Sequence, residues 1–219
     1  MTEATRTIAV PPASVAEAAA ACARAIAAGG LIVLPTDTVY GLACDPRNAT
    51  AIARIYEAKG RPTELALPVL VASADDAAPL VAGQSSGAAG ALFARFWPGA
   101  LTVVLPHAAT LPEALTAGKP TIGLRMPDSD LARAIIAACG GALATTSANA
   151  SGAPPACTPV ELPAELLARV AVVVDAGPCP GSVASTVVDL SVEPPRILRA
   201  GPVTADDLRS VLPEIVSPP

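Results

Sequence analysis

Short apolar runs alternate with alanine-rich segments along the whole chain, and glycine, proline or a polar loop ends almost every one of them. Leu31–Leu34 and Val170–Val174 are typical runs, with the length and β-branched content of buried strands. Because strands and helices interleave irregularly, the pattern predicts an α/β fold with a twisted, mostly mixed open sheet and flanking helices. At 219 residues, one domain over residues 1–219 is the simplest prediction.

Local signals place the ends of the elements. Ser14 and Glu17 form a capping-box pattern at the start of a helix that a glycine pair ends, and Asn48 is the expected cap of the next helix. We further predict helices at Ser86–Phe96, Leu131–Cys139 and Asp206–Leu212, and strands at Leu31–Leu34, Leu67–Val71, Leu101–Leu105, Thr121–Arg125, Ala142–Ala144, Val170–Val174, Ser185–Leu190 and Arg196–Arg199.

Composition limits where the protein works and what it binds. Apolar residues make up 52 % of the chain, but no run approaches the ~20 residues of a membrane-spanning helix, and Met1–Pro12 lacks the apolar centre of a signal peptide. The five scattered cysteines form no C-x-x-C pair, which is typical of reduced thiols. We therefore expect a soluble, cytoplasmic protein without a membrane contact. A net charge of −5 disfavours a surface devoted to nucleic acid, although a local basic patch stays open.

Several familiar catalytic signatures are missing from the sequence. There is no G-x-x-x-x-G-K-[ST] loop and no G-x-G-x-x-G after a strand. His107 is the only histidine and lies in a segment typical of a surface turn, so hydrolysis by a Ser-His-Asp or Cys-His set has little support. No cluster of histidine, cysteine or carboxylate side chains indicates a resident metal site. A magnesium ion carried by a nucleotide would not need such a cluster.

Three polar features remain as candidates for a site. Thr36-Asp-Thr38 and Thr145–Gly152 each follow a predicted strand, where open α/β sheets bind ligands. Lys59 and Arg61 lie at the end of a predicted helix, in a chain with only two lysines. Each feature also has an ordinary structural explanation, either turn formation or the helix dipole. Taken singly, none assigns a function.

The order and wording of the polar segments are nevertheless specific. They are Pro35-Thr-Asp-Thr-Val-Tyr-Gly-Leu42, Lys59-Gly-Arg-Pro62, Phe96-Trp-Pro-Gly99, Leu101-Thr102, Thr121-Ile-Gly-Leu-Arg-Met-Pro127, Ser147-Ala-Asn149, Ser151-Gly152, Ser185-Thr-Val187 and Leu198-Arg-Ala-Gly201. With these segments, spread over residues 29–201, the chain resembles the YrdC family of threonylcarbamoyl-adenylate synthases. The resemblance implies a YrdC-like fold with a concave anion-binding cavity, in the short form without an added C-terminal domain.

The resemblance also implies a reaction, that of the nucleotidyltransferase L-threonylcarbamoyladenylate synthase. L-Threonine, bicarbonate and ATP, with Mg²⁺ accompanying the ATP, would give threonylcarbamoyl-AMP and pyrophosphate. The product would serve the formation of N6-threonylcarbamoyladenosine in tRNA. Expected partners are thus a threonylcarbamoyl transferase machinery and, through a weak contact, tRNA. Because three anionic groups must be held together, charge placement rather than proton transfer would carry the catalysis.

The resemblance also implies which residues of this chain contact the substrates. Lys59 and Arg61 would be catalytic and would anchor the anions. Threonine would contact Thr38, Arg125, Thr145 and Ser185; ATP would contact Arg61, Thr121, Ser147, Pro155 and Arg199; Tyr40 and Asn149 would be further members. The chain departs from the family at Leu65 and Leu70, where relatives often carry polar residues, so we expect only backbone contacts there.

Two other functions stay open at this point. One is an RNA-binding module of the same fold without chemistry, which five aromatic residues and two lysines make less attractive, because stacking platforms and phosphate contacts are then few. The other is a paralogue that acts on a different carbamoyl or adenylate substrate. The residues alone do not specify threonine or the oligomeric state.

Overall fold

A computed structural model describes residues 5–11, 13–83, 87–181 and 183–217. The strands are β1 (Arg6–Ala9), β2 (Ile32–Leu34), β3 (Gly41–Cys44), β4 (Val69–Val71), β5 (Leu101–Pro106), β6 (Thr121–Arg125), β7 (Ala142–Ser147), β8 (Val172–Asp175), β9 (Thr186–Asp189) and β10 (Arg196–Arg199). The helices are α1 (Val15–Ala27), α2 (Ala49–Lys59), α3 (Gly87–Phe96), α4 (Glu113–Thr116), α5 (Asp130–Ala138), α6 (Ala164–Leu167) and α7 (Ala205–Arg209), with 3₁₀ turns η1 (Asp75–Leu80) and η2 (Pro159–Glu161).

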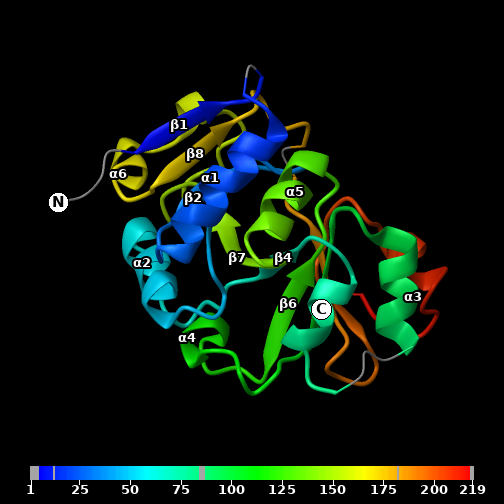
Figure 1. Cartoon of the computed structure of the whole chain (residues 1–219). Helices are drawn as coiled ribbons and strands as arrows, with labels where there is room; N and C mark the ends of the chain where they lie inside the picture. The colour runs from blue at the N-terminus through cyan, green and yellow to red at the C-terminus, as the bar shows by residue number, and fades with distance from the viewer. Residues whose placement is uncertain (1–4, 12, 84–86, 182, 218–219) are drawn as a thin grey trace.

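In the described part of the chain, all ten strands join one sheet in the order β1-β8-β2-β3-β7-β4-β6-β5-β9-β10. Some neighbours are parallel, such as β4 and β6, and others are antiparallel, such as β3 and β7. The predicted mixed α/β sheet with flanking helices is therefore confirmed (Figure 1). The assignment of residues 1–219 to one domain stays a prediction. None of the described helices is long and apolar enough to cross a membrane.

The predicted helix caps are present. The Ser14 hydroxyl accepts a hydrogen bond from the Glu17 amide, and the Glu17 carboxylate accepts one from the Ser14 amide. Asn48 Oδ1 accepts from the Ala51 amide at the start of α2. The predicted helix at Ser86–Phe96 is confirmed from Gly87 on, and Ser86 lies outside the described residues.

Some predicted boundaries were wrong. β6 and β10 have the predicted bounds, but β7 continues to Ser147 through residues predicted as loop. The hydroxyl side chains of that segment are thus fixed by strand pairing with β3, with Gly41 opposite Ser147. β1, β3, α4 and α6 were not predicted, since each is only four residues long and carries little periodic signal.

Two apolar clusters cover the two faces of the sheet. On one face α1 and α5 pack on strands through residues such as Ile26, Ile32, Ile135 and Leu143. On the other face α2, α4 and α6 pack on a larger cluster. Figure 1 shows α1 and α5 side by side in front of the sheet, with β6 beside them rather than beneath them. The face that α1 and α5 share is thus only partly covered by helix.

Candidate active site

A cavity of about 500 Å³ opens on this partly covered face. Residues that pair directly on neighbouring strands lie on the same face of a sheet. Leu143, which packs under α1 and α5, pairs with Leu70, and Leu70 pairs with Arg125, so all three lie on this face. Leu70 and Arg125 both line the cavity. The predicted residues that also line it are Thr38, Arg61, Thr145, Ser147, Asn149, Pro155, Ser185 and Arg199.

The loop after β2 supplies hydroxyl groups. Thr36 Oγ1 accepts hydrogen bonds from the amides of Thr38 and Val39, at 3.1 and 3.2 Å, and contacts the Thr38 hydroxyl at 3.0 Å. The threonine side chain thus holds its own loop as a turn. Thr38 Oγ1 in turn accepts from Arg125 Nη1 at 3.0 Å. The loop and strand β6 are therefore joined at the cavity wall.

Arg125 is the most deeply buried cation of the cavity, with 7 % of its surface exposed. Its Nη2 lies 2.6 Å from both carboxylate oxygens of Asp37, and its Nε donates to the carbonyl of Gly99 at 2.9 Å. Burial lowers the pKa of Arg125, and the neighbouring Asp37 works against that lowering. The guanidinium therefore stays charged and is held on several sides.

Arg61 reaches the cavity because the chain turns sharply after α2. Gly60 ends the helix with φ 57°, the left-handed region that glycine enters without a Cβ penalty. Arg61 then follows in a new direction, and its side chain donates to the carbonyls of Leu65, at 3.3 Å, and Ala66, at 3.2 Å. Leu70 is among the residues that line the cavity and Leu65 is not, and the expectation that both would offer a ligand only backbone contacts stays a prediction.

The third cation comes from the opposite end of the sheet. Arg199 on β10 donates from Nε and Nη2 to the carbonyl of Ser185, at 3.0 and 2.9 Å. The Ser185 hydroxyl lies 2.8 Å from that of Thr102 on β5. Burial lowers the pKa of Arg199, and the charge of Arg125 lowers it further. Two guanidinium groups that repel one another across a cavity favour an anion between them.

The expectation that Lys59 and Arg61 anchor the anions together does not fit the geometry around Lys59. Lys59 is 5 % exposed, and its ammonium donates to the carbonyl of Ser147, to the carbonyl of Asn149 at 2.6 Å and to Asn149 Oδ1 at 3.1 Å. An ammonium has three donors, so these acceptors occupy all of them. Lys59 is absent from the cavity lining and instead holds the loop after β7.

Two further predicted residues lie outside the cavity lining. Tyr40 is fully buried, and its hydroxyl donates to the Gly177 carbonyl at 2.6 Å, so it ties the residue before β3 to the segment after β8. Thr121 is on the same face of β6 as Gly123 and Arg125, one residue pair beyond the cavity, opposite Pro106. Thr121 thus lies on the same strand face as the cavity residues of β6, just beyond the cavity. The functional roles assigned to the whole set stay predictions.

The cavity is lined by only a few kinds of polar side chain. Among the described residues of the lining there are three arginines, seven residues with hydroxyl side chains (Thr36, Thr38, Thr102, Thr145, Thr146, Ser147 and Ser185) and one amide, but no carboxylate, imidazole, thiol or amine. No group of three or more histidine, cysteine, aspartate or glutamate residues occurs in the described chain that could hold a metal ion. The cavity can bind and orient anions, but it offers no side chain suited to shuttle a proton at neutral pH.

Comparison with known proteins decides the family. The family model described as Telomere recombination (Sua5_yciO_yrdC) matches residues 24–201. The chain belongs to the Sua5/YciO/YrdC family. It is 40 % identical over 186 residues to the threonylcarbamoyl-AMP synthase of Bacillus subtilis, covering 83 % of this chain and 53 % of the relative. It is also 40 % identical over 188 residues to a putative threonylcarbamoyl-AMP synthase of Mycobacterium tuberculosis, covering 86 % of each.

Solved structures of the Sua5/YciO/YrdC family agree with the fold. Pyrococcus abyssi Sua5 complexed with L-threonine has a TM-score of 0.91 at 32 % identity, over 99 % of this chain and 63 % of that one. Escherichia coli YciO has a TM-score of 0.81 at 24 % identity, a likeness of fold. The chain thus spans about half the length of the Bacillus subtilis relative and under two thirds of Pyrococcus abyssi Sua5.

The contact sets implied by the family resemblance left out several residues of the site, although Thr36 and Asp37 belong to a candidate loop of the sequence. Thr36 and Thr102 line the cavity, and Asp37 pairs with Arg125. All three lie inside segments that carried the family resemblance, so a signal existed. What the sequence could not show was which of these side chains face the cavity.

Proposed function

We propose that this chain is an L-threonylcarbamoyladenylate synthase. The observation that carries the proposal is the meeting of Arg61, Arg125 and Arg199 around one cavity lined by hydroxyl groups, without a side chain for acid–base catalysis. A volume of about 500 Å³ is in the usual range for a small-molecule site. The names of the relatives support the same activity.

The proposed reaction uses groups that are already reactive once they are brought together. The amine of L-threonine combines with bicarbonate to give a carbamate and water. A carbamate oxygen then attacks the α-phosphorus of ATP, the bond from that phosphorus to the bridging oxygen of the β-phosphate breaks, and pyrophosphate leaves. Holding the reactants in line removes much of the entropic part of the barrier, so a cavity of fixed cations and hydroxyls suits this chemistry.

Each cation has a proposed task. Arg125, beside Thr38, is placed for the threonine carboxylate, with Thr145 and Ser185 around the rest of the amino acid. Arg61 and Arg199, with Ser147, Thr121 and the backbone near Pro155, are placed for the nucleotide. Arginine suits both tasks, because its planar guanidinium matches carboxylate and phosphate oxygens.

Magnesium belongs to this proposal as part of the nucleotide substrate. Mg²⁺ prefers oxygen ligands and is commonly held by one or two carboxylates together with substrate phosphates. The described lining residues offer hydroxyls and carbonyls but no carboxylate. The chain's own residues therefore do not form a magnesium site by themselves, and we propose that the ion enters with the phosphates of ATP.

The use of the product is likewise proposed. Threonylcarbamoyl-AMP is a mixed anhydride, so an enzyme that transfers its threonylcarbamoyl group, here to an adenosine of tRNA, must consume it. A threonylcarbamoyl transferase machinery is the proposed partner, with only a weak contact of this chain with tRNA, and the cytoplasm is the proposed location.

The test is product analysis with labelled bicarbonate. Purified protein is incubated with ATP, Mg²⁺, L-threonine and ¹³C-bicarbonate, and pyrophosphate release is followed while the products are identified by mass spectrometry. We expect pyrophosphate release that needs threonine, and a threonylcarbamoyl-AMP that carries the label. Pyrophosphate release that is indifferent to threonine, or a product without the label, contradicts the proposal.

A further inference from the structure

The carboxylate of Asp37 is in direct contact with Arg125, one of the three cations of the cavity. Both of its oxygens lie 2.6 Å from Arg125 Nη2, and its side chain is 11 % exposed. Asp37 belongs to the candidate loop Thr36-Asp-Thr38, but the family resemblance gave it no contact, and the reaction proposed above assigns it no task. A buried ion pair is costly to form unless its geometry is good, so its presence beside the cavity calls for a reason.

Asp37 lies behind the cavity wall rather than in it. Thr36, Thr38 and Val39 line the cavity, but Asp37 does not. Its backbone carbonyl lies 2.8 Å from the position that a Cβ on Gly181 would take, so this residue packs against the segment before β9. Asp37 therefore contacts Arg125 without itself lining the cavity.

The contacts of Arg125 can be counted against its donors. A guanidinium carries five N–H groups. Nε is bonded to Gly99, Nη2 to Asp37, and one N–H of Nη1 to Thr38. The second N–H of Nη1 has no hydrogen-bond partner among the described residues, and it lies on the atom that contacts Thr38, a cavity residue. The protein contacts thus leave a donor at the cavity edge of the guanidinium.

The backbone around Gly99 completes this support. A Cβ at Gly99 would lie 2.6 Å from the carbonyl of Phe96, so only glycine fits there. The Gly99 amide donates to the carbonyl of Met126, the residue after Arg125, at 2.8 Å. The carbonyl of Gly99 is therefore fixed relative to β6, and Arg125 is gripped from Nε and from Nη2 at once. A guanidinium held at two edges cannot turn in its plane.

We propose that Asp37 is the positioning residue that orients Arg125 as the receptor for the amino-acid carboxylate. The inference rests on the proposed function. Asp37 keeps the buried guanidinium compensated while the substrate is absent, and it directs the uncommitted Nη1 donor toward the cavity. A substrate carboxylate then meets a donor that needs no reorientation, which lowers the entropic cost of binding.

The experiment separates positioning from mere support of the fold. D37N keeps the size of the side chain but removes the charge and one acceptor oxygen. We expect the KM for L-threonine to rise about tenfold or more, while kcat and the KM for ATP change less than about threefold. The matched control is D130N, which removes an exposed carboxylate that pairs with Arg133 at the start of α5. D130N is expected to leave all three parameters unchanged.

A second measurement tests whether Asp37 acts through Arg125. Lysine cannot hold the two-edge geometry of a guanidinium, so R125K removes the arrangement that Asp37 is proposed to fix. D37N added to R125K should change the KM for threonine less than about twofold, because residues that act as one unit are not additive. A full tenfold effect of D37N in the R125K background overturns the proposal.

The outcomes are distinguishable. An unchanged threonine KM in D37N overturns the role of Asp37 and leaves the proposed function intact, as does an equal rise in the KM values for threonine and ATP. If the unsubstituted protein shows no threonine-dependent pyrophosphate release, the proposed function is overturned and the role of Asp37 with it. Should D37N not fold, D37E is measured instead: its longer side chain displaces the carboxylate, and an unchanged threonine KM again overturns the role.

Discussion

The ammonium group of Lys59 donates to the main-chain oxygen of Asn149 at 2.6 Å and to its side-chain oxygen at 3.1 Å. The amide nitrogen of the same Asn149 side chain donates to the carbonyls of Ala150 and Ala153. The Lys59 carbonyl also accepts from the amide of Ser151 at 3.1 Å. The end of α2 and the loop after β7 thus form one hydrogen-bonded unit beside the cavity.

Replacing Lys59 should therefore act through this loop. K59M leaves Asn149 and the Ser147 carbonyl without their buried donor, and losing a hydrogen bond from a charged group costs about 1.5 to 3 kcal/mol. We expect a rise of about 10- to 100-fold in the KM for ATP and faster amide hydrogen exchange across residues 149–155. The control is K119M, which replaces the other lysine of the chain at an exposed position. Unchanged exchange in K59M would contradict the positioning role.

The same lysine gives a pH dependence of stability. Burial, and to a smaller extent the charge of Arg61, lowers the pKa of Lys59 to about 8, from 10.5 for an ordinary lysine. Between these values the unfolded chain binds more protons than the folded one, so the contribution of this group to stability rises with pH. The cost of holding the buried charge is full below about pH 8 and is relieved toward pH 10.5.

Urea unfolding at pH 7.5 and pH 10 measures this effect. Wild type and K59M are compared at each pH, so that the other titrating groups cancel. We expect the stability of wild type relative to K59M to increase at the higher pH. A relative stability that is the same at both values would show that the lysine titrates as an exposed one does, and a lower one at pH 10 would show that folding raises its pKa; either result contradicts the prediction.

The sequence predicts the local elements of this fold better than the pairing of its strands. Apolar runs, helix caps and turn residues predict a mixed α/β sheet, because each of these signals is local. Four-residue elements such as β3 escape detection, yet β3 pairs with β7 and fixes the hydroxyls of Thr145 and Ser147 as strand residues. Strand pairing between distant segments is a property of the folded chain, and no local signal encodes it.

At the candidate site, the sequence likewise does not show where a side chain points. Lys59 and Arg61 are two residues apart, and their charge suggests a shared task. The left-handed turn at Gly60 sends the two side chains to different places, one into the buried loop and the other to the cavity. Distant residues such as Thr38 and Arg125 were assigned to one contact set through the family resemblance, and the structure places them 3.0 Å apart.

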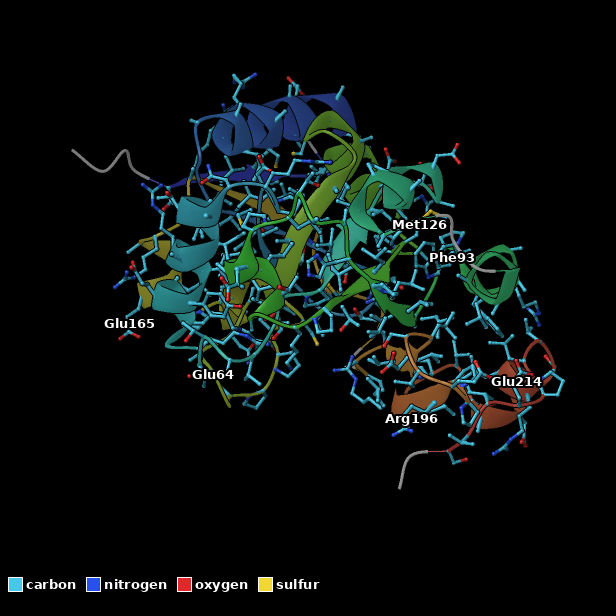
Figure 2. The ribbon with its side chains drawn as sticks, turned by 90° about the horizontal axis from the view of Figure 1, so that it is seen from below. Glu64, Phe93, Met126, Glu165, Arg196 and Glu214 are labelled. Atoms are coloured by element: carbon cyan, nitrogen blue, oxygen red, sulfur yellow. The ribbon has the colours of Figure 1, made fainter. Side chains whose placement is uncertain are left out.

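Arg61 and Arg199 reach the cavity from separate elements and should have separable effects. Arg61 follows α2 and Arg199 lies on β10, and Figure 2 shows Glu64 and Arg196, which belong to these two parts of the chain, well apart in the view from below. R61A and R199A should each lower kcat/KM for ATP by about 10- to 100-fold, the expected loss for one charge-assisted contact. R47A, which removes an exposed arginine outside the lining, is the control. Steady-state kinetics at fixed threonine decide the result, and two fully active variants would remove both residues from the ATP site.

Gly41 offers a test of the sheet that supports the cavity. A Cβ at Gly41 would lie 2.7 Å from Cγ2 of Thr145 on the neighbouring strand, whereas the next atoms, both of Leu34, are 3.8 Å away. G41A should therefore overpack one contact and destabilise the protein by about 1 to 3 kcal/mol. T145S removes Cγ2 and keeps the hydroxyl that donates to the Leu143 carbonyl.

Because a single methyl group causes the clash, the double variant G41A/T145S should recover most of the stability that G41A loses, measured against T145S alone in urea unfolding. The coupling between the two substitutions then exceeds the roughly 0.5 kcal/mol expected for independent sites. Additive effects would mean that β3 and β7 yield by a backbone shift instead. In that case the hydroxyls of β7 would move with the strand, and G41A would lower activity even with T145S present.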